Sequence, residues 1–287
     1  MSDLIINCCL NGMVPTRENN PHTAITPEEI VEAVGRVAAL GVAIVHIHAR
    51  GADEAPTWDP DVYREIIRGI RAHTPDIIIC ATTSGRLWSD QEKRAAVLLL
   101  EGDAKPDMAS LTLGSFNFPH QASVNEPQVI RYLLDAMNAT GIVPELEVFD
   151  LGMIDLLQTF IDEECLRQPY YVNILLGNRG TAAATALNLA FMVDRLPGRG
   201  IWAATGIGKM QFAMNSLAVA MGGHVRVGIE DNLYSDAITK QPASNEQLIE
   251  RILKVARAIN RQPMPPARVR KLLWSSDTLT GINVSDA

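Results

Sequence analysis

Short apolar runs recur along this chain with amphipathic segments between them, and this alternation restricts the possible folds more than any other feature. Eight runs are rich in β-branched or other apolar residues: 4–10, 43–48, 77–82, 108–113, 144–149, 170–176, 201–205 and 224–229. Eight parallel strands close a barrel, which typically takes roughly 250 residues, and the chain has 287. We therefore predict an α/β fold, a (β/α)8 TIM barrel that forms a single domain over residues 1–287, with a C-terminal extension over about residues 262–287.

The segments between these runs carry signals that start helices. Thr26-Pro27-Glu28-Glu29 is a capping box with proline at the first helical position. Further helix starts are predicted at Asp59-Pro60, at Ser89 with Glu92, and at Ser244 with Gln247. An open doubly wound sheet is the competing fold. Such a sheet usually carries a glycine-rich fingerprint after its first strand, whereas residues 11–15 read Asn-Gly-Met-Val-Pro, so we favour the barrel.

Composition and charge exclude several classes of partner. The net charge is −8 and the Arg and Lys residues are scattered, which argues against a nucleic-acid partner. No run approaches the roughly 18 apolar residues that a membrane span needs. The N-terminus lacks the basic segment and cleavage site of a signal peptide, so we expect a cytoplasmic protein. The cysteines, which form no CxxC pair, are predicted to be buried free thiols: Cys8, Cys9, Cys80 and Cys165.

Two histidines end the second apolar run, where a barrel of this kind gathers its functional residues. His46 and His48 are two positions apart, so on a strand they point to the same side. A hydrogen-bonded structural pair is the alternative, but two imidazoles on one face at a strand end favour a metal site. Glu230 follows the last run, which closes the barrel beside the first and so lies within reach of the second. Two histidines and one carboxylate leave coordination positions open, which is typical of a catalytic zinc ion.

Charged residues inside the apolar runs also indicate a functional site at the mouth of the barrel. Arg226 lies within the last run, where an unpaired buried charge would be costly, so it is predicted to form one charged group with Glu230 and Asp231. The fifth run contains Glu145 and Glu147. A strand packed on both faces has no structural use for two carboxylates, so at least one of them is expected to enter the mouth of the barrel.

Hydroxyl groups gather at the ends of the third and fourth runs. The third run ends in Thr82-Thr83-Ser84-Gly85, a turn whose hydroxyls and backbone N–H groups can hold a carboxylate. An ordinary helix cap would explain one of these three hydroxyls. The fourth run adds Ser110. We therefore predict a carboxylate-binding site at this turn.

Together these residues resemble the β-keto acid cleavage enzyme family, whose named member is the 3-keto-5-aminohexanoate cleavage enzyme. The resemblance covers nearly the whole chain. It is carried by residues 20–21, 26–30, 46–50, 106–110, 145–150 and 221–232.

The resemblance implies a zinc-bearing barrel, usually a homotetramer, that takes a β-keto acid and acetyl-CoA as co-substrate and yields acetoacetate and a shortened acyl-CoA. It implies that His46, His48 and Glu230 are the zinc ligands. Thr82 stands where the family has a substrate-binding serine, Gly85 matches a backbone contact, and Ser110 stands where the named member has threonine. Glu147, Arg226 and Asp231 match its active-site charged residues. In the mechanism that follows from this match, Asp231 acts as base beside Arg226, while Thr82, the Thr83–Gly85 backbone and Ser110 anchor the substrate carboxylate.

One position departs from the family pattern. Where the aminohexanoate enzyme carries a glutamate that receives the ammonium group of its substrate, this chain has Val14. An apolar side chain cannot pair with a cation, so we expect a substrate without that amino group, with a neutral or apolar tail.

Two other enzyme classes on the same fold are alternatives. A metal-dependent hydrolase of the amidohydrolase type also uses the HxH pattern, but it adds histidines on the fifth and sixth strands, where this chain has none. A CoA-independent aldolase or lyase shares the enolate chemistry and stays open. Dependence on acetyl-CoA separates the first interpretation from both alternatives.

Overall fold

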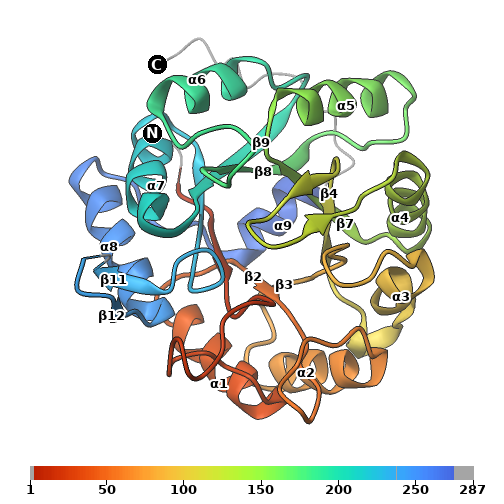
Figure 1. Ribbon diagram of the computed structural model, residues 1–287, viewed down its shortest axis with the longest axis horizontal. Coiled ribbons are helices and arrows are strands. Elements are labelled where there is room, and N and C mark those ends of the chain that lie inside the picture. The colour runs from red at the N-terminus through yellow and green to blue at the C-terminus, as the bar shows by residue number, and fades with distance from the viewer. Residues whose placement is uncertain (1–2, 237, 275–287) are drawn as a thin grey trace.

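The computed structural model, which describes residues 3–236 and 238–274, contains a closed barrel of eight parallel strands (Figure 1). Around the barrel the strands follow the order β1-β10-β9-β8-β7-β4-β3-β2. Their bounds are β1 (Ile6–Cys9), β2 (Ile44–Ile47), β3 (Ile78–Ala81), β4 (Met108–Thr112), β7 (Val143–Val148), β8 (Tyr170–Leu176), β9 (Gly200–Gly206) and β10 (His224–Val227). Each of the eight predicted runs contains or overlaps one of these strands, so the predicted TIM barrel is confirmed.

The barrel closes where the first strand meets the last. β1 pairs with β10 through Ile6 and Val225, and with β2 through Cys9 and His46. The predicted neighbourhood of the first, second and last strands is therefore confirmed. This closure brings the end of β2 and the segment after β10 to the same part of the barrel mouth.

Helices surround the barrel, as Figure 1 shows. Their bounds are α1 (Pro27–Ala38), α2 (Pro60–His73), α3 (Gln91–Ala95), α4 (Pro127–Thr140), α5 (Leu151–Asp162), α6 (Ala186–Asp194), α7 (Gln211–Ala220), α8 (Asn245–Ala258) and α9 (Pro266–Trp274). Three short 3-10 helices lie between them: η1 (Ala96–Leu99), η2 (Gly102–Ala104) and η3 (Gly208–Met210).

The predicted helix starts are correct at three positions and wrong by one residue at the fourth. Capping boxes form at Thr26 and Ser244, and Asp59 caps α2. The cap of α3 is Asp90 rather than Ser89, because the Asp90 carboxylate accepts a hydrogen bond from the backbone N–H of Lys93. A carboxylate at this position also carries the charge that a helix N-terminus favours.

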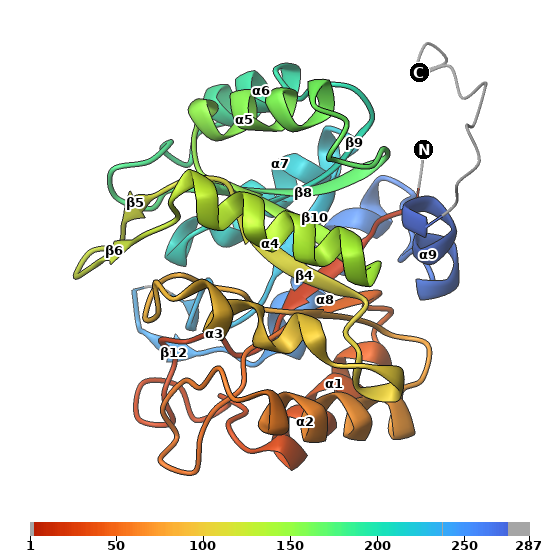
Figure 2. The same ribbon diagram turned by 90° about the vertical axis from the view of Figure 1, so that its right-hand side faces the viewer.

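Two short hairpins, which the sequence analysis did not predict, stand at the mouth. β5 (Phe116–Asn117) pairs with β6 (Ala122–Ser123), and β11 (Tyr234–Asp236) pairs with β12 (Gln241–Pro242). Figure 2 shows the β5–β6 hairpin projecting from the end of the barrel opposite α9. The loops that carry this hairpin follow β4, so they overhang the carboxyl ends of the strands.

Helix α9 lies against the opposite end of the barrel, as Figure 2 shows. Its Val269 and Leu273 side chains pack with Ile44, Ile78 and Met108, which come from the beginnings of three strands. The described part of the predicted C-terminal extension therefore covers the floor of the barrel. Residues 275–287 of that extension lie outside the described residues.

Apolar side chains fill the space between the barrel and its helices. Cys8, Cys9 and Cys80 are buried free thiols, as predicted. Cys165 is also a free thiol but is only partly buried, so the predicted burial is wrong for this residue. Over residues 3–236 and 238–274, no helix combines the length and the apolar character that crossing a bilayer requires.

Candidate active site

A pocket of about 360 Å³ opens at the carboxyl ends of the barrel strands. This is the face at which TIM-barrel enzymes carry their active sites. Several residues that the sequence analysis selected line it: Val14, His46, His48, Thr82, Glu147, Arg226, Glu230 and Asp231. The structure therefore brings the predicted metal ligands and the predicted charged group into one cavity.

The two histidines of β2 and its following segment converge on the carboxylate of Glu230. The Nε2 atoms of His46 and His48 lie 3.1 Å apart. Nε2 of His48 is 3.2 Å from Oε1 of Glu230, and Nε2 of His46 is 3.8 Å from Oε2. These three side chains form a group whose ligand atoms all lie within 4.8 Å of one another. Burial lowers the pKa of His48, which favours the neutral imidazole that a metal requires.

Glu145 fixes the orientation of the His46 ring. The Nδ1 atom of His46 lies 2.6 Å from Oε2 of Glu145, and Glu145 is fully buried. Asn7 and Asn173 donate hydrogen bonds to the other oxygen of the same carboxylate. Burial opposes the charge of Glu145, but His46 and Arg226 lower its pKa, so the carboxylate is ionised. An ionised carboxylate can only accept, and Nδ1 of His46 is therefore the donor. Burial opposes the charge of His46, but the charges of Glu145 and Glu230 raise the pKa of His46. In the neutral form that metal binding requires, the lone pair of Nε2 faces Glu230 and His48. Metal-binding histidines commonly donate from their other nitrogen to a carboxylate in this way.

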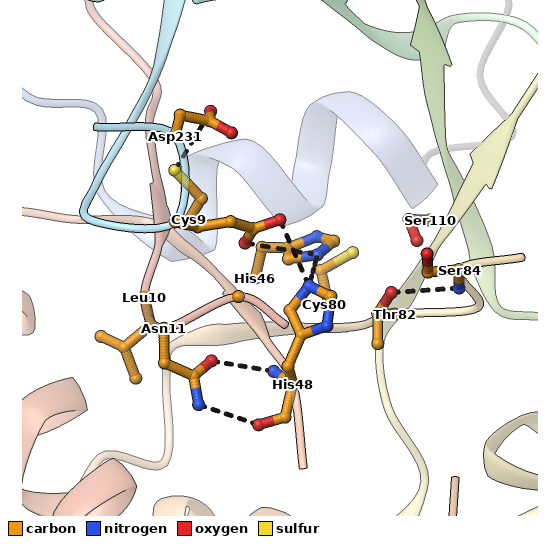
Figure 3. Close-up of polar contacts among 12 residues, drawn as sticks. Cys9, Leu10, Asn11, His46, His48, Cys80, Thr82, Ser84, Ser110 and Asp231 are labelled. Carbon is orange, nitrogen blue, oxygen red and sulfur yellow. Dashed lines mark hydrogen bonds and ion pairs between the residues drawn. The ribbon is translucent and has the colours of Figure 1, made fainter. Parts of the chain in front are cut away.

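Asn11 holds His48 through its backbone. The Asn11 side chain accepts a hydrogen bond from the His48 N–H at 3.0 Å and donates one to the His48 carbonyl at 2.8 Å, as Figure 3 shows. Asn11 is fully buried and also donates to the carbonyl of Ala24. Two bonds from one rigid amide fix the direction in which the His48 side chain leaves the chain.

Gly12 leaves the space that Glu230 occupies. Its φ of +65° lies in the left-handed region that favours glycine. A Cβ atom built on Gly12 would lie 2.5 Å from Cγ of Glu230. The turn after β1 therefore accepts only glycine if Glu230 is to reach the histidines.

Arg226 is the centre of the charged group. Its side chain is fully buried on β10 and points into the barrel. It donates from Nε to Asp231 at 3.0 Å, from Nη1 to Glu147 at 3.1 Å, and from Nη2 to Glu230 at 2.8 Å. Burial opposes its charge, but Asp231 and Glu230 raise the pKa of Arg226 well above its ordinary value. The predicted charged group of Arg226, Glu230 and Asp231 is present, with Glu147 added.

Several buried carboxylates surround the single guanidinium group of Arg226, so together they carry an excess of negative charge. Glu147, Glu230 and Asp231 all bond to Arg226, and Glu145 lies 3.7 Å from it. Burial raises the pKa of Glu147 against the opposing effect of Arg226, and the charge of Glu145 raises it further. Arg226 lowers the pKa of Glu230 well below its ordinary range, although burial opposes this. Such an excess of negative charge in a buried site favours a further cation beside Glu230.

These residues fit a zinc ion. Zinc–nitrogen bonds are about 2.0–2.1 Å long, so two nitrogens bound to one tetrahedral zinc ion lie about 3.3 Å from each other. The Nε2 atoms of His46 and His48 are 3.1 Å apart, which is close to that distance. Oε2 of Glu230 is buried and has no hydrogen-bond partner among the residues that the structure describes. Two nitrogens and one carboxylate facing a pocket are the donor set of a catalytic zinc site, which leaves a position open for a ligand.

A second group with metal-ligand chemistry, His46 with Cys80 and Glu145, lies deeper in the barrel. Its atoms are already bonded to one another, since Cys80 donates to Glu145 at 3.3 Å and His46 is bonded to the same oxygen. Burial raises the pKa of the Cys80 thiol well above its ordinary value, so this sulfur keeps its proton in the metal-free site. The existing bonds within this inner group orient His46.

The predicted carboxylate-binding turn is only partly at the pocket. Thr82 lines the pocket, where its hydroxyl oxygen accepts from the Ser84 N–H at 3.1 Å, as Figure 3 shows. Thr83 and Ser110 are buried and bond to each other instead. The Thr83 N–H donates to the Ser110 hydroxyl at 3.1 Å, and the Thr83 hydroxyl donates to the Ser110 carbonyl at 2.5 Å. Neither residue belongs to the pocket wall.

Gly85 lies behind that wall. A Cβ atom at Gly85 would lie 2.5 Å from the carbonyl oxygen of Val124 and 2.7 Å from Nη1 of Arg94. Close packing against these two residues explains a glycine at this position. Thr83, Gly85 and Ser110 thus fix the turn that presents Thr82.

Several residues of the site were missed by sequence reasoning. Asn7, Asn11 and Asn173 hold Glu145 and His48, and Arg86 and Phe118 line the pocket from loops. The three asparagines lie in or directly after buried apolar strands, which is the same signal that singled out Arg226. The two loop residues gave no such signal, because polar and aromatic side chains are common in loops.

Comparison with known proteins gives the family. The model of the beta-keto acid cleavage enzyme family matches residues 3–274. A 3-keto-5-aminohexanoate cleavage enzyme from Fusobacterium nucleatum subsp. nucleatum is 35% identical to this chain over 95% of the chain and 98% of that protein. A 3-oxoadipate:acetyl-CoA acetyltransferase from Cupriavidus necator is 33% identical over 94% of each.

A solved structure supports the fold. The apo structure of ObcA matches with a TM-score of 0.76 and 21% identity, covering 88% of this chain and 65% of that one. The two chains share the TIM-barrel fold. The family match over almost the whole described chain confirms the resemblance that the sequence analysis drew, and the chain therefore belongs to the β-keto acid cleavage enzyme family.

Proposed function

We propose that this enzyme uses a zinc ion held by His46, His48 and Glu230 to cleave a β-keto acid with acetyl-CoA, giving acetoacetate and an acyl-CoA shortened by two carbons. The observation that carries the proposal is the convergence of these three ligand groups within 4.8 Å at a pocket that also contains the Arg226–Asp231 pair. The two curated relatives named above bear the names of a β-keto acid cleavage enzyme and an acetyl-CoA acetyltransferase.

When bound, zinc supplies a Lewis acid that polarises the ketone of the substrate and makes its neighbouring C–H more acidic. Glu145 keeps the Nε2 lone pair of His46 directed at the metal position, and Asn11 does the same for His48 through its backbone. Arg226 holds Glu230 at the same position. The chain thus provides a prearranged set of ligands.

Asp231 is the proposed base. Asp231 lines the pocket and its side chain is 6% exposed, which leaves the carboxylate accessible to a substrate. Arg226 and the Cys9 thiol both hydrogen-bond to its Oδ2 atom, and Figure 3 shows the contact with Cys9. The other oxygen, Oδ1, is therefore the atom that takes the proton from C2 of the keto acid, the carbon between the carboxylate and the ketone.

The remaining steps exchange one carbon–carbon bond for another. The C2 carbanion attacks the thioester carbonyl of acetyl-CoA, and CoA leaves as a thiolate. The thiolate attacks the ketone carbon of the substrate, the bond between that carbon and C2 breaks, and the acyl group leaves on CoA. Protonation of C2 by Asp231 completes acetoacetate. Arg226, beside Asp231, stabilises the negative charge that develops in each step.

Thr82 is the proposed anchor of the substrate carboxylate. Its hydroxyl hydrogen is free to donate into the pocket, because the hydroxyl oxygen is an acceptor for the N–H of Ser84. We assign Thr83, Gly85 and Ser110 to the support of this turn. Val14, which lines the same pocket, offers no charge to an ammonium group, so the substrate lacks the amino group of 3-keto-5-aminohexanoate.

The homotetrameric state and the cytoplasmic location, expected from the sequence, are parts of this proposal. Helix α6 supports the first, because it exposes Leu187 and Phe191, which are 78% and 51% exposed. Neighbouring large apolar side chains of this kind commonly mark a contact between subunits.

The test is to mix the purified enzyme with a β-keto acid, with and without acetyl-CoA, and to measure acetoacetate and acyl-CoA. We expect both products only when acetyl-CoA is present, and loss of both after the metal is removed with a chelator, with recovery when zinc is restored. A metal-dependent hydrolase or a CoA-independent lyase would consume the keto acid equally well without acetyl-CoA, and that outcome would overturn the proposal.

A further inference from the structure

Arg86 is a cation in the wall of the active-site pocket that no acidic residue of the described chain neutralises. It lies in the loop after β3 and lines the pocket together with His46 and Glu230. The centre of its guanidinium group lies 3.9 Å from the centroid of the Phe118 ring. Over residues 3–236 and 238–274, the guanidinium has no ion pair and no hydrogen bond. All of its N–H donors are therefore available to a ligand.

The environment of Arg86 favours an anion. The side chain is half-buried, and this burial lowers the pKa of the guanidinium. A charge that has lost part of its water and gained no partner is in an unfavourable state. Stacking on Phe118 orients the planar group and leaves its edge free, the arrangement in which arginine takes a carboxylate through two parallel hydrogen bonds.

The other arginines near the pocket already hold acceptors, and Arg50, whose buried Nε has no partner among the described residues, does not line the pocket. Arg226 uses Nε, Nη1 and Nη2 on Asp231, Glu147 and Glu230. Arg50 donates to backbone carbonyl groups, including those of Gly12 and Pro15. Arg86 differs from both because its guanidinium contacts no acceptor within the part of the chain that the structure describes; its backbone N–H donates to the Ser84 hydroxyl.

Arg86 belongs to the outer part of the pocket. Phe118, on which it stacks, follows β5 in the hairpin that projects over the mouth in Figure 2. Its guanidinium makes no ion pair with Glu230, although the charge of Glu230 acts on it. The ketone and the C1 carboxylate of a β-keto acid are separated by one carbon, so both lie at the metal ligands. The group that reaches Arg86 is therefore at the opposite end of the substrate.

The phosphates of CoA do not satisfy this geometry. The thioester carbon of acetyl-CoA must reach C2 of the keto acid at the metal ligands, and the long pantetheine arm separates that carbon from the nearest phosphate. A residue that shares one pocket of about 360 Å³ with His46 and His48 is too close to the reacting carbon to bind those phosphates.

We propose that Arg86 binds an anionic group at the end of the substrate tail, so that this enzyme cleaves β-keto acids that carry a second acidic group. Met13, Val14, Phe116 and Phe149 line the pocket and suit the methylene groups between the two ends. The inference rests on the proposed function for the identity of the reaction. It revises the expectation of a neutral tail, which rested on Val14 alone, and it agrees with the exclusion of an ammonium group, which Arg86 repels.

The test compares two keto acids of equal carbon count, 3-oxoadipate with a terminal carboxylate and 3-oxohexanoate without one. Binding of each to the zinc-loaded enzyme is measured by calorimetry in the absence of acetyl-CoA, so that no turnover is needed. We expect wild type to bind 3-oxoadipate about 10- to 100-fold more tightly, the usual effect of a hydrogen bond to a charged group. In Arg86→Gln this ratio falls to near 1, and Arg86→Lys restores part of it. Arg257→Gln, an exposed arginine on α8, serves as the matched control and keeps the wild-type ratio.

The two proposals fail in different ways. Equal binding of the two acids by wild type, or an unchanged ratio in Arg86→Gln, would overturn the role of Arg86. A fall in affinity for acetyl-CoA in Arg86→Gln without a change in the ratio would do the same and assign Arg86 to the co-substrate. If the ratio behaves as expected but neither acid yields acetoacetate with acetyl-CoA, Arg86 keeps its role and the proposed reaction is wrong.

Discussion

At the scale of single residues, the role of His46 depends on Glu145. The carboxylate of Glu145 accepts from Nδ1 of His46 at 2.6 Å and is itself held by Asn7 and Asn173. A buried carboxylate in this position fixes the ring and increases the basicity of its other nitrogen. In the proposed metal centre, Glu145 therefore acts as a positioning residue that holds His46 without touching the metal.

Glu145→Gln tests this positioning role. The amide oxygen still accepts from Nδ1 of His46, but the negative charge is gone, so we expect the affinity for zinc to fall by about 10- to 100-fold. Competition with a chromophoric chelator measures that affinity, and circular dichroism checks that the barrel is folded. Glu250→Gln, an exposed glutamate of α8, is the matched control. Zinc affinity equal to that of wild type in Glu145→Gln would show that the Glu145 charge has no part in metal binding.

Asp231→Asn separates the base from the metal site. Asparagine has the same shape and keeps an oxygen for the N–H of Arg226, but it cannot take a proton from C2. We expect turnover to fall by about 10²- to 10⁴-fold while zinc stays bound. Acetoacetate formation and elemental analysis measure the two quantities on the same sample, with Asp194→Asn on the exposed side of α6 as control. Turnover close to that of wild type would remove Asp231 from the role of base.

The residues that the sequence analysis found share one property: a charged or polar side chain in a place where the core has no use for it. This property identified His46 and Arg226 on strands and His48 directly after one. It also led to Glu230, because β10 was expected beside β1. Arg86 was missed because its position over the pocket depends on the β5–β6 hairpin, and no local pattern predicts which loop residue such a hairpin will meet.

At the scale of elements, the barrel strands were predictable and the short hairpins were not. The barrel strands are runs of four to seven residues, most of them buried on both faces, and such a run gives a clear apolar signal. β5 and β6 have two residues each, too few for any periodicity. The same hairpin carries Phe118 over the pocket, so the specificity proposed for Arg86 depends on the part of the fold with the weakest sequence signal.

The turn after β1 illustrates a constraint that acts between elements. Gly12 looks like an ordinary loop glycine in the sequence, yet its missing side chain is the space for Glu230. Gly228, after β10, shows the same kind of close approach, since a Cβ atom there would lie 2.1 Å from the carbonyl oxygen of Cys9. Both glycines let the ends of β1 and β10 approach closely enough to place Glu230 beside the histidines.

At the scale of the whole molecule, the barrel separates stability from chemistry. The floor is closed by α9, whose Val269 and Leu273 pack on the first residues of the strands. The mouth gathers buried carboxylates around one guanidinium, an arrangement that costs folding free energy unless a cation completes it. The packing at the floor therefore stabilises the barrel that holds the site, and a bound metal ion is expected to reduce the repulsion among the carboxylates at the mouth.

The most direct measurement is anomalous diffraction at the zinc absorption edge from crystals of the zinc-loaded enzyme. We predict one strong peak within about 2.0–2.2 Å of Nε2 of His46, Nε2 of His48 and the carboxylate of Glu230. A peak at the inner group of Cys80 and Glu145, or no peak at all with the histidine nitrogens bonded only to protein atoms, would contradict the proposed metal centre and the chemistry that depends on it.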